Sequence, residues 1–187
     1  ADRGIEDSDF DFVTTNNFEG SREITQHLIN RGHEKIAFLS NKVYSTERLR
    51  YDGFISKLKE LKIDQDPSIT IIDKSAFNVN RYLNHAHKIL KNRGKFTAVY
   101  AGHDRIALLF YAAAKNLGLN VPEDFSLVGY DNMPLTTVSL TTMHQPIYEM
   151  GQESIKLIVA RINNRSIKTK NIILKSNLIK RNSVKSI

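Results

Sequence analysis

Two side chains of opposite charge occupy positions where a protein built on a sheet can bind a small polar molecule. Asp131 follows Phe125–Gly129, a short apolar run typical of a buried strand. Arg50 lies at the edge of the apolar stripe of a predicted helix over residues 46–62, and Thr46 lies one turn earlier on the same face. A guanidinium, a hydroxyl and a carboxylate that meet at strand carboxyl ends can bind vicinal hydroxyls or a carboxylate.

Each of these residues also has a purely structural interpretation. Arg50 can extend along the edge of the core, or pair with a structural acid such as Asp131. Asp131 can order the turn over residues 131–134 through bonds to the backbone, with Gly129 allowing a sharp turn just before it. Phe77, which precedes a predicted helix, is either a ring that covers the apolar face of a ligand or a core residue. The residues alone leave both roles open.

Other kinds of chemistry lack their sequence signals. The nine glycines are dispersed and form no phosphate-binding motif, and no nucleophile elbow or zinc-helix motif is present. His85 and His87 point roughly 200° apart on a helix, so they cannot share a metal ion from one face. We therefore expect no catalysis, no metal site and no cofactor.

The charge of the chain is unevenly distributed. The net charge is +7, yet residues 1–153 carry 18 basic and 20 acidic residues, or 18 − 20 = −2. The nine remaining basic residues alternate with apolar segments near residues 171–174 and 178–179, which favours a folded edge with solvated lysines over a nucleic-acid-binding tail. No apolar run approaches the ~20 residues of a membrane helix. The chain has no cysteine, which leaves its compartment undecided.

Short strand-like runs alternate with longer helical patterns, which predicts an α/β fold with a doubly wound, mostly parallel sheet and helices on both faces. Gly32 and Gly118 stand where helix ends need a left-handed residue, and Asp104 can cap the helix that follows it. The last helix should pack through one apolar side, which includes Ile147, Met150, Leu157, Ile158 and Ile162. The predicted strands are 10–14, 35–40, 68–72, 96–100, 125–129 and 171–175, and the predicted helices are 17–31, 46–62, 78–93, 104–117 and 146–163.

Several segments, in order, resemble the effector-binding domain of the lac repressor and galactose repressor (LacI/GalR) family. They are Val13–Gly20, His27–Phe38, Arg48–Phe54, Gly102–Ala107, Val121–Asn132 and Leu140–Pro146. The resemblance covers nearly the whole chain and implies a two-lobed fold like the periplasmic sugar-binding proteins (type I), with the effector bound between the lobes. It places residues 1–15 at the end of the first lobe, 16–132 in the second, 133–165 back in the first and 166–187 in the second. The headpiece and most of the first lobe would precede Ala1.

The resemblance also assigns roles to individual residues. Arg50 falls on the arginine that grips the effector, Thr46 on a hydroxyl position, Asp131 on an acidic residue and Phe77 on the stacking aromatic. His103 lines the same site at a position usually occupied by Asn in sugar-responsive members, and Asn16 replaces a more usual Asp. Leu108 and Tyr111, three apart on one helix, are predicted to contribute to a homodimer interface.

The resemblance predicts a cytoplasmic, sugar-responsive transcriptional repressor that binds DNA through a preceding domain. The main alternative is a sugar-binding protein of a transport system, which has the same fold but needs an export signal. A flavodoxin-like enzyme is disfavoured because no nucleophile–base arrangement is evident.

Overall fold

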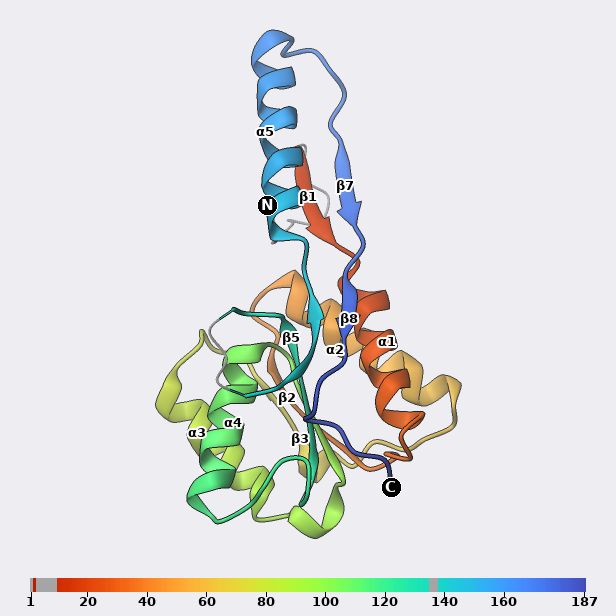
Figure 1. The fold of residues 1–187 in the computed structure, drawn as a ribbon. Helices are drawn as coiled ribbons and strands as arrows, with labels where there is room; N and C mark the ends of the chain where they lie inside the picture. The colour runs from red at the N-terminus through yellow and green to blue at the C-terminus, as the bar shows by residue number, and fades with distance from the viewer. Residues whose placement is uncertain (1, 3–9, 135–137) are drawn as a thin grey trace.

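Strands of this chain form two sheets that lie one above the other in Figure 1. The computed structural model describes residue 2 and residues 10–134 and 138–187. The larger sheet has the strand order β3-β2-β4-β5-β6-β8, and all its pairs are parallel except β6 with β8. The smaller sheet pairs β1 with β7 in parallel, and helix α5 lies along it in the narrow upper part of the molecule.

The elements of the chain alternate between strand and helix over most of its length. The strands are β1 (Phe12–Thr15), β2 (Ile36–Asn41), β3 (Thr70–Asp73), β4 (Ala98–Ala101), β5 (Ser126–Asp131), β6 (Thr141–His144), β7 (Asn171–Leu174) and β8 (Asn177–Ile179). The helices are α1 (Asn17–Ile29), α2 (Ser45–Glu60), α3 (Val79–Leu90), α4 (Asp104–Asn116) and α5 (Ile147–Asn163), with short 3-10 turns at Pro67–Ile69 and Arg93–Lys95.

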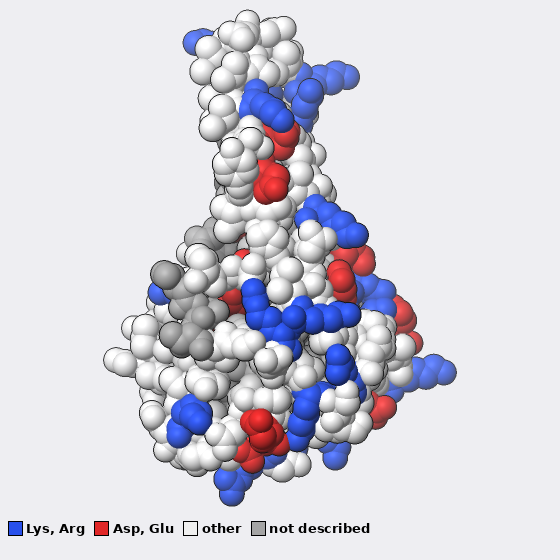
Figure 2. All heavy atoms as spheres, in the orientation of Figure 1, with Lys and Arg blue, Asp and Glu red and all other residues white. Residues whose placement is uncertain are grey.

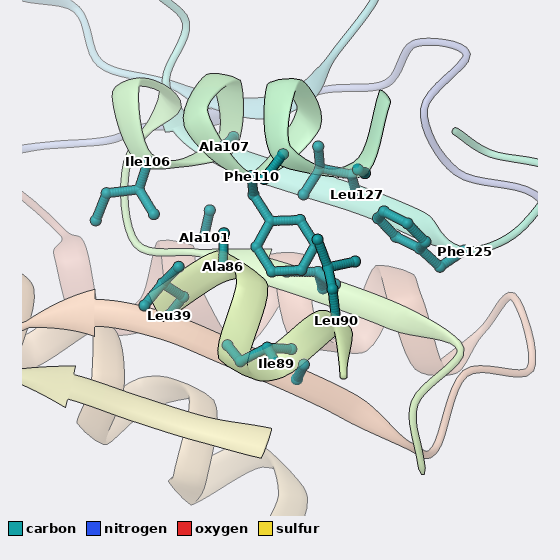
Figure 3. Close-up of a cluster of buried hydrophobic side chains, with 14 of the residues drawn as sticks. Leu39, Ala86, Ile89, Leu90, Ala101, Ile106, Ala107, Phe110, Phe125 and Leu127 are labelled. Atoms are coloured by element: carbon teal, nitrogen blue, oxygen red, sulfur yellow. The ribbon is translucent and has the colours of Figure 1, made fainter. Parts of the chain in front are cut away.

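The central strands are buried on both faces, which explains their nearly continuous apolar sequences. Along β2, Ile36 and Phe38 face the core under α1 and α2, whereas Ala37 and Leu39 face the core under α3 and α4. Figure 3 shows the second of these cores, with the Phe110 side chain of α4 directed toward α3. Because successive residues of a strand point to opposite faces, one strand supplies both cores. The doubly wound α/β fold predicted from the sequence is confirmed.

All the predicted strands and helices are present, with ends shifted by at most three residues. Gly32 and Gly118 have φ of +92° and +74°, the left-handed conformation predicted for them. Strands β6 and β8 were not among the predicted elements.

These two strands change the predicted division of the chain. Strand β6, within the range 133–165 predicted to return to the first lobe, lies in the large sheet next to β5, while α5 packs on the small sheet. Strand β7, within the range 166–187 predicted for the second lobe, lies in the small sheet, and only β8 reaches the large one. The chain therefore crosses between the sheets at residues 15–17, 144–147 and 174–177. Residues 1, 3–9 and 135–137 of the predicted ranges lie outside the described residues.

Helix α5 is less buried than its apolar spacing predicts. Met150 and Leu157 pack against Val13 of β1, but Ile158 and Ile162 are 59% and 72% exposed. Within residues 10–134 and 138–187 the small sheet has two strands, and these cover one narrow side of the helix. Within the described part of the chain, no helix is both long enough and apolar enough to span a bilayer.

The basic C-terminal segment is folded, as its alternating pattern predicts. Lys175 and Lys180 are exposed beside β8, while Ser176 between them is buried. Figure 2 shows lysine and arginine side chains interspersed with acidic ones on this face of the molecule.

Candidate functional site

A cavity of about 650 Å³ opens where the parallel strands of the large sheet end. Except for Asp2, its lining residues lie at or after the carboxyl ends of β2, β3, β4, β5 and β6 in turn, where open α/β sheets bind ligands. They are Asp2, Tyr44, Thr46, Glu47, Arg50, Ala76, Phe77, His103, Arg105, Asp131, Met133, Gln145 and Ile147. The five residues predicted to bind a ligand, Thr46, Arg50, Phe77, His103 and Asp131, therefore line the same cavity.

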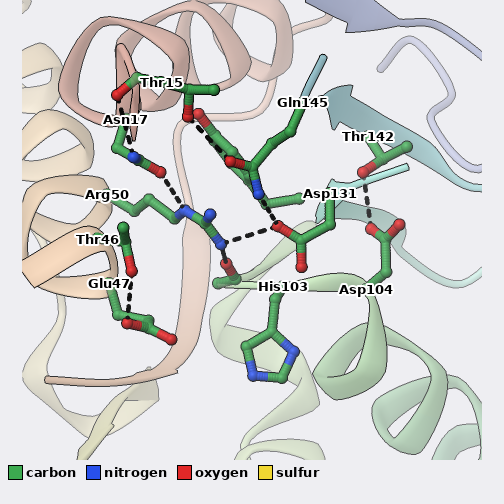
Figure 4. A network of polar contacts seen from close by, with 12 residues as sticks. Thr15, Asn17, Thr46, Glu47, Arg50, His103, Asp104, Asp131, Thr142 and Gln145 are labelled. Carbon is green, nitrogen blue, oxygen red and sulfur yellow. Dashed lines mark hydrogen bonds and ion pairs between the residues drawn. The ribbon is translucent and has the colours of Figure 1, made fainter. Parts of the chain in front are cut away.

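Arg50 is only 3% exposed, and neighbouring groups contact its guanidinium from several sides. Its Nε donates to Asn17 Oδ1 at 2.8 Å and its Nη1 to the Gly102 carbonyl at 2.9 Å. Nη1 also lies 3.2 Å from Asp131 Oδ1, and the guanidinium stacks 3.7 Å over the Tyr130 ring. Burial lowers the pKa of Arg50, but Asp131 together with Tyr130, Tyr100 and Glu47 more than offsets this and leaves the pKa above its usual value. The ion pair of Arg50 with Asp131, drawn in Figure 4, thus lines the cavity.

Asp131 reaches Arg50 because the chain turns abruptly at the end of β5. The φ angles of Asp131 and Asn132 are 114° and 55°, a region that non-glycine residues seldom adopt. Asp131 Oδ1 also accepts a hydrogen bond from Gln145 Nε2 at 2.7 Å. Burial raises the pKa of Asp131 to about 6, although Arg50 acts in the opposite direction. A strained, partly exposed carboxylate with such a pKa is well suited to accept hydrogen bonds from ligand hydroxyls.

Two details of this region differ from the sequence prediction. The cap of α4 is His103, whose Nδ1 accepts from the Ile106 amide at 3.4 Å, whereas the Asp104 carboxylate accepts from Thr142 Oγ1 and the Met133 amide. Gly129 is needed for space and not for a turn, because a Cβ there would lie 2.2 Å from Asp104 Oδ1. Asp104 on α4 is thus a buried residue that joins this helix to β6 and to the turn after β5.

Thr46 and Glu47 form the α2 side of the cavity. Both are buried, and Thr46 Oγ1 donates to Glu47 Oε2 at 2.9 Å. With its proton engaged in this way, the Thr46 hydroxyl can accept a hydrogen bond from a ligand. As predicted from their spacing, Thr46 and Arg50 line the same cavity from one helix.

Phe77 is half-buried, and neighbouring side chains cover part of its ring. Tyr82 stacks on it with ring centroids 5.1 Å apart and an interplanar angle of 20°. The Arg105 guanidinium lies 4.3 Å above the ring, and the His103 ring centroid is 5.6 Å away. The ring therefore supports Arg105 as well as contributing to the cavity wall.

Three further polar residues contribute to the site although they were not predicted as ligand contacts. Asn17 orients Arg50, and Gln145 bonds both to Asp131 and to the Thr15 hydroxyl, which lies 2.9 Å from Gln145 Oε1. Asp2 also lines the cavity, and its buried Oδ1 accepts no hydrogen bond from the described residues. Asn17 and Gln145 lie inside motifs of the predicted resemblance, but their pairing with Arg50 and Asp131 requires the fold.

The residues predicted for a dimer interface lie on α4, outside the cavity. Leu108 and Tyr111 are both half-buried, and Tyr111 packs against the core beneath α3 and α4. The large exposed apolar side chains lie elsewhere, and several of them are on α5.

Asp131 should make the stability of the protein depend on pH. Its pKa of about 6 in the folded state exceeds that of an unfolded aspartate, so its contribution is fully present below about pH 4 and is lost as the pH rises through 6. We expect Asp131→Asn to gain roughly 2–3 kcal/mol of unfolding free energy relative to wild type between pH 4 and pH 7. Denaturant titrations at each pH measure the difference in unfolding free energy between the variant and the wild type, with the exposed Asp64→Asn as control. A difference that stays constant with pH, or that changes in the opposite direction, would show that burial does not raise the pKa of Asp131.

The fold agrees with the comparisons to known proteins. Residues 25–184 match the family model of the periplasmic binding protein-like domain, and the chain therefore belongs to that family. Within the family, its sequence and fold are those of a LacI/GalR effector-binding domain.

Individual relatives agree with this assignment. The chain is 32% identical to the HTH-type transcriptional repressor PurR of Mannheimia succiniciproducens, over 100% of this chain and 56% of that protein. It thus spans about half the length of the curated relatives it matches. A LacI-family regulator from Bacillus cereus subsp. cytotoxis superposes with a TM-score of 0.90 at 26% identity, covering 100% of this chain and 67% of that one. A ribose-bound LacI-family regulator from Enterococcus faecium gives 0.84 at 29% identity, covering 95% and 66%. These relatives favour a regulator over a transport protein.

Proposed function

We propose that this chain is the effector-sensing part of a bacterial, cytoplasmic transcriptional repressor and that its cavity binds a sugar or sugar derivative. The observation that carries the proposal is the convergence of Arg50, Asp131 and Thr46 on one cavity at the strand carboxyl ends. Arg50 and Asp131 would bind ligand hydroxyls, Thr46 would accept a further hydrogen bond, and Phe77 and His103 would form the wall. No catalytic step is proposed.

The mechanism we propose is a shift between arrangements of the two sheets. Gln145 lies on one crossover between the sheets and bonds to Thr15 on another and to Asp131 in the cavity. A ligand that engages Asp131 would therefore favour one geometry of these crossovers. In a longer protein this would change the spacing of DNA-binding domains in a dimer.

A thermal-shift screen of sugars with the 187-residue chain tests the proposal. A compound present at 100 times its Kd should add about 2.7 kcal/mol of stability. We expect Arg50→Lys and Asp131→Asn, which preserve much of the volume, each to weaken binding of the compound. Undiminished affinity in both folded variants would place the ligand outside this cavity and contradict the proposal.

We also propose that α4 contributes to a homodimer through Leu108 and Tyr111. The wild type should sediment as a dimer, and Leu108→Glu with Tyr111→Glu should make it monomeric. Leu108→Glu alone is the safer variant for folding, because Tyr111 packs on the core. The comparison variant Ile158→Glu with Ile162→Glu, on exposed positions of α5, should remain dimeric. The reverse pattern would assign self-association to α5 and remove α4 from the interface.

A further inference from the structure

Arg105 is a cation of the cavity that pairs with no carboxylate of the described residues. The other arginine of the cavity, Arg50, is neutralised by Asp131 at 3.2 Å. Within residues 10–134 and 138–187, the contact that fixes the Arg105 guanidinium is its stacking over Phe77 at 4.3 Å. Its charge therefore remains available to a ligand in the cavity that it lines.

Two acids, one beside Arg105 in the sequence and one in the cavity lining, bond to other protein groups. Asp104, adjacent in sequence, is fully buried and directs both carboxylate oxygens away, to Thr142 Oγ1 at 2.7 Å and to the Met133 amide at 2.8 Å (Figure 4). Glu47 accepts from Thr46. Arg105 is exposed, and among the described residues it forms no ion pair with the cavity's other acids, Asp2 and Glu47.

Phe77 gives this guanidinium a defined position. Tyr82, stacked on Phe77 at 5.1 Å and fully buried, anchors the ring to the core. An arginine on an aromatic face loses little of its hydrogen-bonding capacity, because its N–H groups lie in the plane of the guanidinium and point outward. A planar guanidinium held this way matches the paired oxygens of a phosphate or carboxylate.

We propose that Arg105 recognises an anionic substituent of the effector, so that the ligand is an acidic sugar derivative, either a phosphate ester or a sugar acid. The hydroxyl-bearing ring would lie against Arg50 and Asp131, and the anionic group would lie against Arg105. This inference rests on the proposed function and specifies the ligand class of the same site.

Calorimetry with matched ligands tests it. The probes are neutral hexoses, their 6-phosphates and the corresponding uronic acids, titrated into wild type, Arg105→Gln, Arg105→Lys and the exposed control Arg93→Gln. For wild type and Arg93→Gln, we expect an acidic derivative to bind at least about tenfold tighter than its neutral parent, the factor given by roughly one charge-assisted hydrogen bond. Arg105→Gln should reduce this preference to about twofold without weakening the neutral sugar, and Arg105→Lys should retain part of it. The two acidic series show whether phosphate or carboxylate is preferred.

Three results would overturn the inference, and they can be told apart. A neutral sugar that binds as tightly as its acidic derivatives, in an Arg50-dependent manner, would refute the role of Arg105 while leaving the proposed function intact. If Arg105→Gln lowers the affinity for neutral and acidic ligands equally, Arg105 only helps to position Phe77 and does not recognise an anionic group. Binding of no sugar of either kind would remove both proposals.

Discussion

Replacing Arg50 with alanine should lower the free energy of unfolding by about 3 kcal/mol, because it leaves a buried carboxylate without its partner. The substitution also removes the donors to Asn17 Oδ1 and the Gly102 carbonyl and empties the space above Tyr130. Asp131 is a quarter exposed and can relieve part of the cost by taking up a proton, which places the effect at the lower end of the range for buried pairs. Urea denaturation at neutral pH measures the change.

The exposed Arg93→Ala variant is the matched control and should change stability by less than about 0.5 kcal/mol. A similarly small effect of Arg50→Ala would mean that the guanidinium serves binding alone. Arg50→Lys keeps a positive charge near Asp131 and should lie between the two.

Gly53→Ala should be comparably damaging, although it adds a single methyl group. A Cβ at Gly53 would lie 2.3 Å from the Phe18 carbonyl oxygen and 3.0 Å from Ser21 Cβ, so α2 would have to separate from α1. Overpacking of this kind costs roughly 1–3 kcal/mol. The effect should extend to the site, because Arg50 on α2 is oriented by Asn17 on α1. We therefore expect weaker effector binding as well as a lower melting temperature.

Gly151→Ala provides the opposite case. A Cβ there meets nothing within 4 Å, and the residue lies inside α5. Alanine should stabilise the helix by about 0.5–1 kcal/mol. Equal responses of the two glycine variants would refute a specific contact between α1 and α2 at Gly53.

The positions of the cavity residues could be predicted from the sequence because they depend on local rules. Asp131 follows a strand of apolar residues, and Thr46 and Arg50 are one helical turn apart, so their placement follows from the periods of strand and helix. Whether Arg50 binds a ligand or pairs with Asp131 could not be decided in this way. The structure contains the pair, and the pair itself lines the cavity.

Features that depend on contacts between distant segments were missed. Strand β6 has the sequence Thr-Thr-Met-His and β8 is three residues long, so neither carries a strong strand signal, and each forms through pairing in the large sheet. Asp104 was predicted to cap a helix because it precedes an apolar helical segment. Its carboxylate instead accepts a hydrogen bond from Thr142, which lies 38 positions away in the sequence. The exposure of Ile158 and Ile162 likewise depends on how little of α5 the small sheet covers.

A crystal structure of the chain with the sugar or sugar derivative found by the screen tests the central claim most directly. The account predicts ligand oxygens at about 2.6–3.2 Å from both Asp131 and Arg50, in the cavity at the carboxyl ends of β2 to β5. A ligand seated elsewhere, such as the apolar groove of about 360 Å³ lined by Phe12, Phe18 and Leu49, would contradict it.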